Sequence, residues 1–128
     1  MSKIQARQKS ALSEGSSTPG ITRHIAFEGE GYIVVRARSE PGIISGWHHH
    51  GDYDVYGYIV SGSVRFESGP AEEDVVSLGP GDFFHVPANT IHREINPSED
   101  EKNEMILFLH GTGPLVVNVD DSGPGLAL

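Results

Sequence analysis

The stretch that decides the fold runs from Gly46 to Gly62 and reads G-W-H-H-H-G-D-Y-D-V-Y-G-Y-I-V-S-G. Three of the chain's seven histidines stand side by side in it, ahead of an alternating aromatic and aliphatic run. Because alternate residues of a β-strand point to the same face, His48 and His50 project together and His49 projects the other way. Two imidazoles on one face can share a transition metal if a third ligand arrives from elsewhere. On this stretch alone, a histidine-rich surface strand explains the pattern equally well.

The bulk composition excludes several classes of protein. At 128 residues the chain fits one domain, and its net charge of −9 disfavours nucleic acid, which binds basic surfaces. The absence of cysteine excludes disulfides, thiolate metal sites and cysteine nucleophiles. No apolar run approaches the ~20 residues that span a bilayer, so no membrane partner is expected. No secretory signal is visible at the N-terminus, and we expect a cytoplasmic protein.

From Ile21 onward the chain alternates between short segments rich in β-branched and aromatic residues and turns rich in Gly, Pro, Asn and Asp. About ten strands at this spacing predict an all-β sandwich or barrel. Residues 1–20 are polar and predict a flexible N-terminal arm, which could also order against a partner subunit. The barrel domain is expected over residues 21–120, and residues 121–128 form a C-terminal tail.

A third ligand is expected where a later strand leaves a turn. The segment from Gly79 to Asn96 reads G-P-G-D-F-F-H-V-P-A-N-T-I-H-R-E-I-N, with a break at Pro87 and a return strand that begins near His92. His92, Glu94 and Asn96 share one face of that strand. His92 therefore joins His48 and His50 as a predicted metal ligand.

At this point the sequence resembles the cupins, small double-stranded β-helix barrels. The second cupin motif reads Gly, five residues, Pro, one residue, Gly, two residues, His, three residues, Asn. Here it is matched, with every spacing kept, by Gly81, Pro87, Asn89 in place of the glycine, His92 and Asn96. Asparagine tolerates the positive φ that this position requires better than most residues do.

The first cupin motif reads His, one residue, His, three or four residues, Glu, six residues, Gly. His48, His50 and Gly62 match it, but Val55 stands where counting back from Gly62 puts the glutamate, and Asp54 precedes it. The resemblance implies one divalent transition metal (Fe, Mn, Ni, Cu or Zn). Either a bulge turns Asp54 inward as a fourth ligand, or the site is a three-histidine variant.

The resemblance leaves two functions open. The first is a metalloenzyme acting on a small molecule, by dioxygenase-type chemistry or by Lewis-acid lyase or isomerase chemistry, with Tyr56, Tyr58 and Glu94 as candidate catalytic groups. The second is a non-catalytic cupin that binds or senses a small ligand or a metal. A carboxylate or arginine facing the metal favours the enzyme, and purely apolar walls favour binding. A homodimer through an apolar sheet face is also expected.

Overall fold

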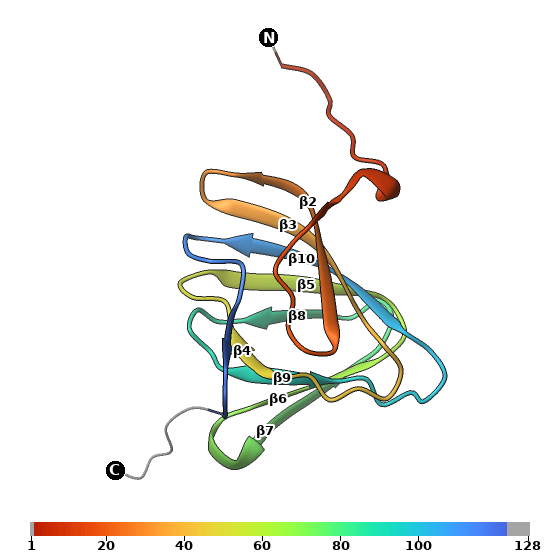
Figure 1. Cartoon of the computed structure of the whole chain (residues 1–128), viewed down its shortest axis with the longest axis vertical. Coiled ribbons are helices and arrows are strands. Elements are labelled where there is room, and N and C mark those ends of the chain that lie inside the picture. Colours follow the sequence, from red (N-terminus) through yellow and green to blue (C-terminus); the bar gives the residue numbers. More distant parts are fainter. Residues whose placement is uncertain (1, 123–128) are drawn as a thin grey trace.

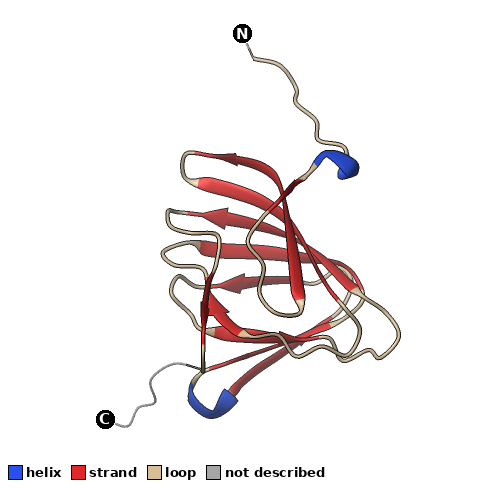
Figure 2. Ribbon diagram, viewed as in Figure 1, coloured by secondary structure: helices blue, strands red, loops and turns tan. Residues whose placement is uncertain are grey.

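Two antiparallel β-sheets packed face to face make up the computed structural model, which describes residues 2–122 (Figures 1 and 2). The strands are β1 (Ser13–Glu14), β2 (Ile21–Gly29), β3 (Tyr32–Ser39), β4 (Trp47–His49), β5 (Asp54–Ser61), β6 (Val64–Ser68), β7 (Asp74–Leu78), β8 (Phe83–Val86), β9 (His92–Ile95), β10 (Asn103–His110) and β11 (Val117–Val119). Two single 3₁₀ turns, η1 (Lys9–Ala11) and η2 (Pro70–Glu72), complete the structure. The all-β prediction is confirmed. No helix in this part of the chain is long and apolar enough to cross a membrane.

The chain passes repeatedly from one sheet to the other, which brings distant segments together. One sheet has the order β1-β2-β3-β10-β5-β8 and the other the order β11-β4-β9-β6-β7. From β3 to β6 the strands alternate between sheets, and β8 to β11 alternate again. As a result β4 and β9 are neighbours, and His48 lies directly opposite His92 in their antiparallel pair.

The core lies between the sheets and follows the alternation of the strands. Along β5 the burial pattern places Val55, Gly57 and Ile59 inward and the residues between them outward. β10 repeats the pattern, with Leu107 and Leu109 buried beside them. Apolar side chains from β3, β5 and β10 therefore form most of the core under one sheet.

Gly57 allows the two layers to approach closely. A Cβ atom at this position would lie 2.1 Å from Cζ of Phe84, whose ring fills the space over the backbone of β5. Phe84 in turn packs on Phe66 of the facing sheet, with ring centroids 4.6 Å apart. The missing side chain is thus replaced by an aromatic ring from the next strand of the sheet.

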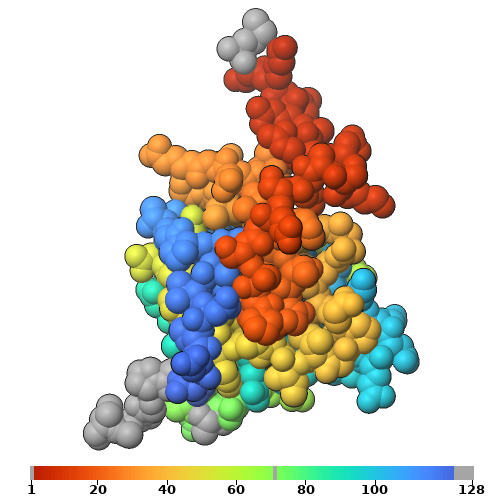
Figure 3. Space-filling view, in the orientation of Figure 1, coloured from red at the N-terminus to blue at the C-terminus, as the bar shows by residue number. Residues whose placement is uncertain are grey.

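The segment before β2 is built into the barrel. Ser13–Glu14 pairs with β2 of the same chain, and Thr18 is 2% exposed. Thr18 donates to Asn118 Oδ1 at 2.9 Å, so the segment lies beside the strand that ends the barrel (Figure 3). Within the expected flexible arm over residues 1–20, the structure thus places Ser13–Glu14 and Thr18 against the barrel of the same chain. The predicted C-terminal tail falls outside the described residues from residue 123 onward.

Candidate metal centre

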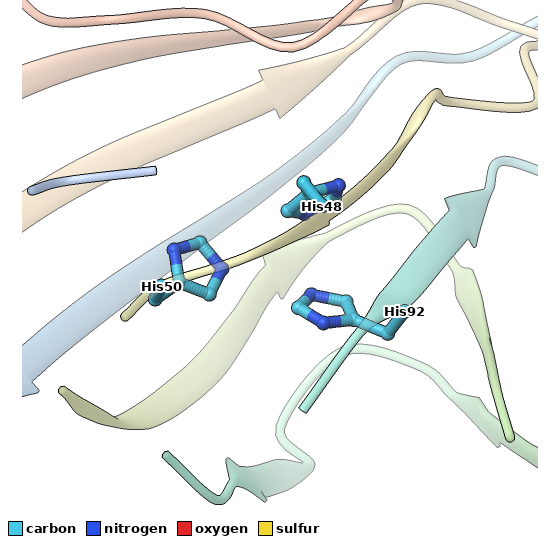
Figure 4. A group of neighbouring side chains, drawn as sticks. All are labelled: His48, His50 and His92. Atoms are coloured by element: carbon cyan, nitrogen blue, oxygen red, sulfur yellow. The ribbon is translucent and has the colours of Figure 1, made fainter. Parts of the chain in front are cut away.

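The three histidines predicted as ligands converge inside the barrel (Figure 4). His48 lies in β4 and His50 directly follows that strand, and both point to its inner face, while His92 points inward from β9. One ring nitrogen of each lies within 4.8 Å of the other two. The ring centroids of His48 and His92 are 4.3 Å apart, and both lie 5.3 Å from that of His50. All three side chains are buried, at 0%, 5% and 2% exposure in chain order.

Backbone carbonyls fix the orientation of each ring. The Nδ1 atoms of His48, His50 and His92 lie 3.0, 2.8 and 2.9 Å from the carbonyl oxygens of Gly46, Leu115 and Thr90. A carbonyl oxygen only accepts, so each Nδ1 carries the hydrogen and donates it. The Nε2 lone pairs are then free and directed away from the backbone. Metal-binding histidines commonly use this arrangement, in which the second nitrogen is anchored by an acceptor.

Burial keeps two of these rings neutral. Burial, together with the neighbouring His92 and His48, lowers the pKa of His50 from 6.5 to about 3. Burial also lowers the pKa of His92 to about 4, helped by His48 and opposed by the carboxylate of Glu94. Neutral imidazole is the form that binds a metal ion. At neutral pH both rings therefore offer a lone pair to the centre of the cluster.

The carboxylate of Glu94 lies beside the histidines, one inward position beyond His92 on β9. Its Oε2 atom is 3.4 Å from Nε2 of His48 and 4.0 Å from Nε2 of His92. Burial alone raises the pKa of Glu94, but His48, His92 and the cationic Arg23 outweigh it and hold the pKa at about 2. The 3.4 Å contact between Glu94 Oε2 and His48 Nε2 is not a hydrogen bond, and His48 Nε2 has no hydrogen-bond partner within residues 2–122.

A small cavity of about 100 Å³ opens beside His92. It lies between the sheet edges, with walls from β6, β7 and β8 and from the turn before β9. Its walls are Phe66, Val76, Val86 and Pro87, with Ser68, His85, Thr90 and His92 adding polar groups. This volume is below the roughly 300–1,000 Å³ of typical ligand pockets, so the cavity suits a small molecule or a small part of a larger one.

Comparisons with known proteins agree with this architecture. The family model of the Cupin domain matches residues 35–109, more than half of the chain. The chain belongs to the cupin family. No curated protein matches it.

Similar solved structures include KdgF from Halomonas sp., 22% identical over 87% of this chain and 96% of that one, with a TM-score of 0.69. The polyketide cyclase RemF from Streptomyces resistomycificus is 16% identical over 94% and 88% of the two chains, with a TM-score of 0.73. Oxalate decarboxylase from Bacillus subtilis is 17% identical over 93% of this chain and 33% of that one, with a TM-score of 0.73. At these identities the likeness shows the cupin fold.

The second cupin motif adopts the expected geometry at its atypical residue. Asn89 has a φ of 59°, so asparagine provides the left-handed conformation for which most cupins use glycine. Its backbone N–H donates to Gly51 O at 2.7 Å, and its side chain donates to Asp52 at 2.9 Å. The turn before His92 is thereby tied to the turn after His50, which holds the two halves of the histidine cluster in register.

Asp54, the doubtful fourth ligand from the first motif, is not brought to the histidines. It lies on the outer face of β5, and its Oδ1 is 2.9 Å from Nε2 of His85. β5 pairs with β8 and β10 without a register shift at Asp54, so the bulge that would turn its side chain inward is not formed. The structure corrects this assignment, because an inward Val55 requires an outward Asp54.

Tyr56 and Tyr58 also face outward, with 48% and 39% exposure. Tyr56 stacks on His85 with ring centroids 4.6 Å apart, and Tyr58 packs against Phe83 at 4.8 Å. The structure therefore places neither of these two candidate catalytic hydroxyls at the histidine cluster. Of the three candidate catalytic side chains, Glu94 is the one placed at the cluster.

The sequence analysis missed Arg23, which is 1% exposed inside the barrel. Its Nη1 donates to Thr18 Oγ1 at 2.8 Å, and its Nε has no hydrogen-bond partner in the described part of the chain. Burial lowers the pKa of Arg23, and the charge of Glu94 opposes that shift. The alternation along β2 could have predicted this burial, because Arg23 lies two residues from the buried Ile21 and shares its face of the strand.

The cluster fits a transition metal by its donor set and by its unsatisfied atoms. Three imidazole nitrogens with free lone pairs suit zinc, copper, iron or nickel. His48 Nε2 and Glu94 Oε1 are buried and have no hydrogen-bond partner among the described residues. A cation at the centre would satisfy His48 Nε2 and would compensate the buried charge of Glu94, whereas a metal-free interior leaves both groups desolvated.

Proposed function

We propose that this cupin holds one divalent transition metal through His48, His50 and His92 and acts as an enzyme on a small organic molecule. The observation that carries the proposal is the convergence of three buried lone pairs, each directed by a backbone carbonyl, beside a cavity. With three protein nitrogens, an ion that prefers more ligands keeps open positions, as catalytic sites require.

Lewis-acid chemistry is the reaction type that the site supports best. A divalent ion there would polarise a carbonyl or carboxylate oxygen of the bound molecule. Glu94, a buried anion beside the cluster, favours an enzyme over a passive pocket. One structural neighbour is named a polyketide cyclase and another an oxalate decarboxylase, so this fold supports ring closure and decarboxylation elsewhere. We therefore propose a lyase or isomerase in preference to a dioxygenase.

The chain's own residues have separate roles in this proposal. The apolar walls at Phe66, Val86 and Pro87 exclude water from one side of the bound molecule. The hydroxyls of Ser68 and Thr90 line the same cavity and can donate to its polar groups. The volume of about 100 Å³ favours a small ligand, or a small part of a larger one, beside His92.

The test is a turnover screen on protein loaded separately with zinc, manganese, nickel and iron. Small dicarbonyl and hydroxycarboxylate compounds are incubated in deuterated buffer and followed by proton NMR, with oxygen uptake recorded in parallel. We expect loss of a C–H signal or a new product with wild-type protein and neither with His92→Ala. Oxygen consumption that matches product would instead assign a dioxygenase.

A non-catalytic binding cupin is the second candidate, and the composition of the cavity wall favours it. Four of the residues that line the cavity, Phe66, Val76, Val86 and Pro87, are apolar. Such a wall can bind a small apolar group without activating it. Saturable binding in the same NMR experiment, without turnover under any metal, would support this function.

A further inference from the structure

Glu94 has an unusual position for a buried carboxylate. It is 6% exposed, and its Oε1 has no hydrogen-bond partner within residues 2–122. Its Oε2 faces Nε2 of His48 and of His92, two of the three nitrogens predicted to bind the metal. A buried carboxylate loses its hydration, and a cation beside it compensates that loss.

Glu67, on the neighbouring strand β6, shows how this chain satisfies a buried carboxylate by protein contacts alone. Glu67 is 7% exposed, and its Oε1 accepts from Arg93 at 2.9 Å while its Oε2 lies 3.0 Å from Nη2 of Arg65. Both of its oxygens therefore contact cations. Glu94 has the same degree of burial, but its Oε1 has no hydrogen-bond partner among the described residues and its Oε2 faces imidazole nitrogens instead of arginines.

The distances from Glu94 to two of the three histidines can be compared with those between ligands that share an ion. Two ligand atoms each about 2.1 Å from one metal, at angles of 90° to 109°, lie about 3.0 to 3.4 Å apart. The 3.4 Å between Glu94 Oε2 and His48 Nε2 falls within this range, and the 4.0 Å to His92 Nε2 is slightly longer.

We propose that Glu94 is the fourth protein ligand of the metal. This inference rests on the metal site proposed above. It places the carboxylate ligand on β9, two residues after the last histidine, instead of at Asp54 on β5, where the cupin spacing first suggested it. Three neutral imidazoles and one carboxylate leave a divalent ion with a net charge near +1. They also occupy four positions, so a six-coordinate ion keeps two for substrate.

Cobalt(II) binding tests the inference in four proteins: wild type, Glu94→Leu, Glu67→Leu and Asp54→Asn. Glu67→Leu is the matched control, since it removes an equally buried carboxylate from the same sheet. We expect one Co²⁺ per wild-type chain, with an affinity about tenfold or more lower and a changed visible spectrum in Glu94→Leu. The two control variants should keep the wild-type spectrum and affinity.

A crystal of the wild-type protein with Zn²⁺ keeps the test independent of how any variant folds. We expect a Glu94 oxygen at about 2.0–2.2 Å from the zinc. A carboxylate more than about 3 Å from a zinc held by the three histidines, or an unchanged cobalt spectrum and affinity in Glu94→Leu, would overturn the inference and leave the proposed function standing. Failure of the wild-type protein to bind Co²⁺ or Zn²⁺ would overturn both.

Discussion

Acidification of the metal-free protein should weaken the fold through the two buried histidines. In the folded state the pKa of His50 is lowered to about 3 and that of His92 to about 4, whereas an unfolded histidine titrates near 6.5. As the pH falls below 6.5, these histidines therefore bind protons in the unfolded chain but stay unprotonated in the folded chain. The free energy of unfolding is at its full value above pH 6.5 and falls until the pH reaches the folded pKa values.

The magnitude follows from the two pKa values. Between pH 8 and pH 5, each ring contributes a loss of about 2 kcal/mol, so the pair contributes about 4 kcal/mol. The stability of a domain of this size is about 5–15 kcal/mol, so the loss is a large fraction of it. Glu94, with a pKa of about 2, stays ionised over this interval and adds little to the slope.

Urea unfolding of chelator-treated protein at several pH values measures this loss, with Trp47, the single tryptophan, as fluorescent probe. His50→Ala should remove about half of the pH dependence, about 2 kcal/mol. His85→Ala, which alters a half-exposed ring on the outer face, should leave the dependence intact. A wild-type change below about 1 kcal/mol between pH 8 and pH 5, or an unchanged slope in His50→Ala, would refute the reasoning.

Three further predictions concern the barrel around the site. Thr18→Ala removes the hydroxyl that donates to Asn118 at 2.9 Å, and it should cost about 1–3 kcal/mol in urea unfolding; an unchanged midpoint would mean that the N-terminal segment adds no stability. Gly57→Ala places a Cβ 2.1 Å from Phe84 Cζ, and it should lower stability by about 1–3 kcal/mol through overpacking, which thermal denaturation would detect. The homodimer stays a prediction: the exposed aromatic face that includes Phe83, which is 74% exposed, should pair with a second copy, and light scattering should give a dimer mass that Phe83→Glu reduces to a monomer.

The sequence was sufficient to predict that His48 and His50 share one face and that His92 lies near them, because each position depends on local rules. Period two along a strand places the first two rings on one face, and the motif spacing places the third ring after a turn. Asn89 could be assigned its positive φ because few residues tolerate that conformation. In each case the constraint lies within a few residues of the side chain concerned.

The orientation of Asp54 and the position of the N-terminal segment could not be predicted, because both depend on residues far along the chain. Asp54 faces outward because β5 packs Val55, Gly57 and Ile59 inward, and Gly57 can do so only because Phe84 fills its place. Residues 13–20 are polar in sequence, yet pairing with β2 and the contact with Asn118 order them. Neither partner is visible from local composition, so the sequence favoured a free arm and left Glu94 one candidate among several.

The metal content of tag-free protein is the most direct test of the central claim. Elemental analysis gives the number of metal atoms per chain in the wild type and in His92→Ala. Each protein is measured as purified without added metal and again after reconstitution. The convergence of the three Nε2 lone pairs predicts about one equivalent of a divalent transition metal in the wild type and almost none in the variant. Equal metal in both proteins, or no metal in the wild type even after reconstitution, would contradict the account.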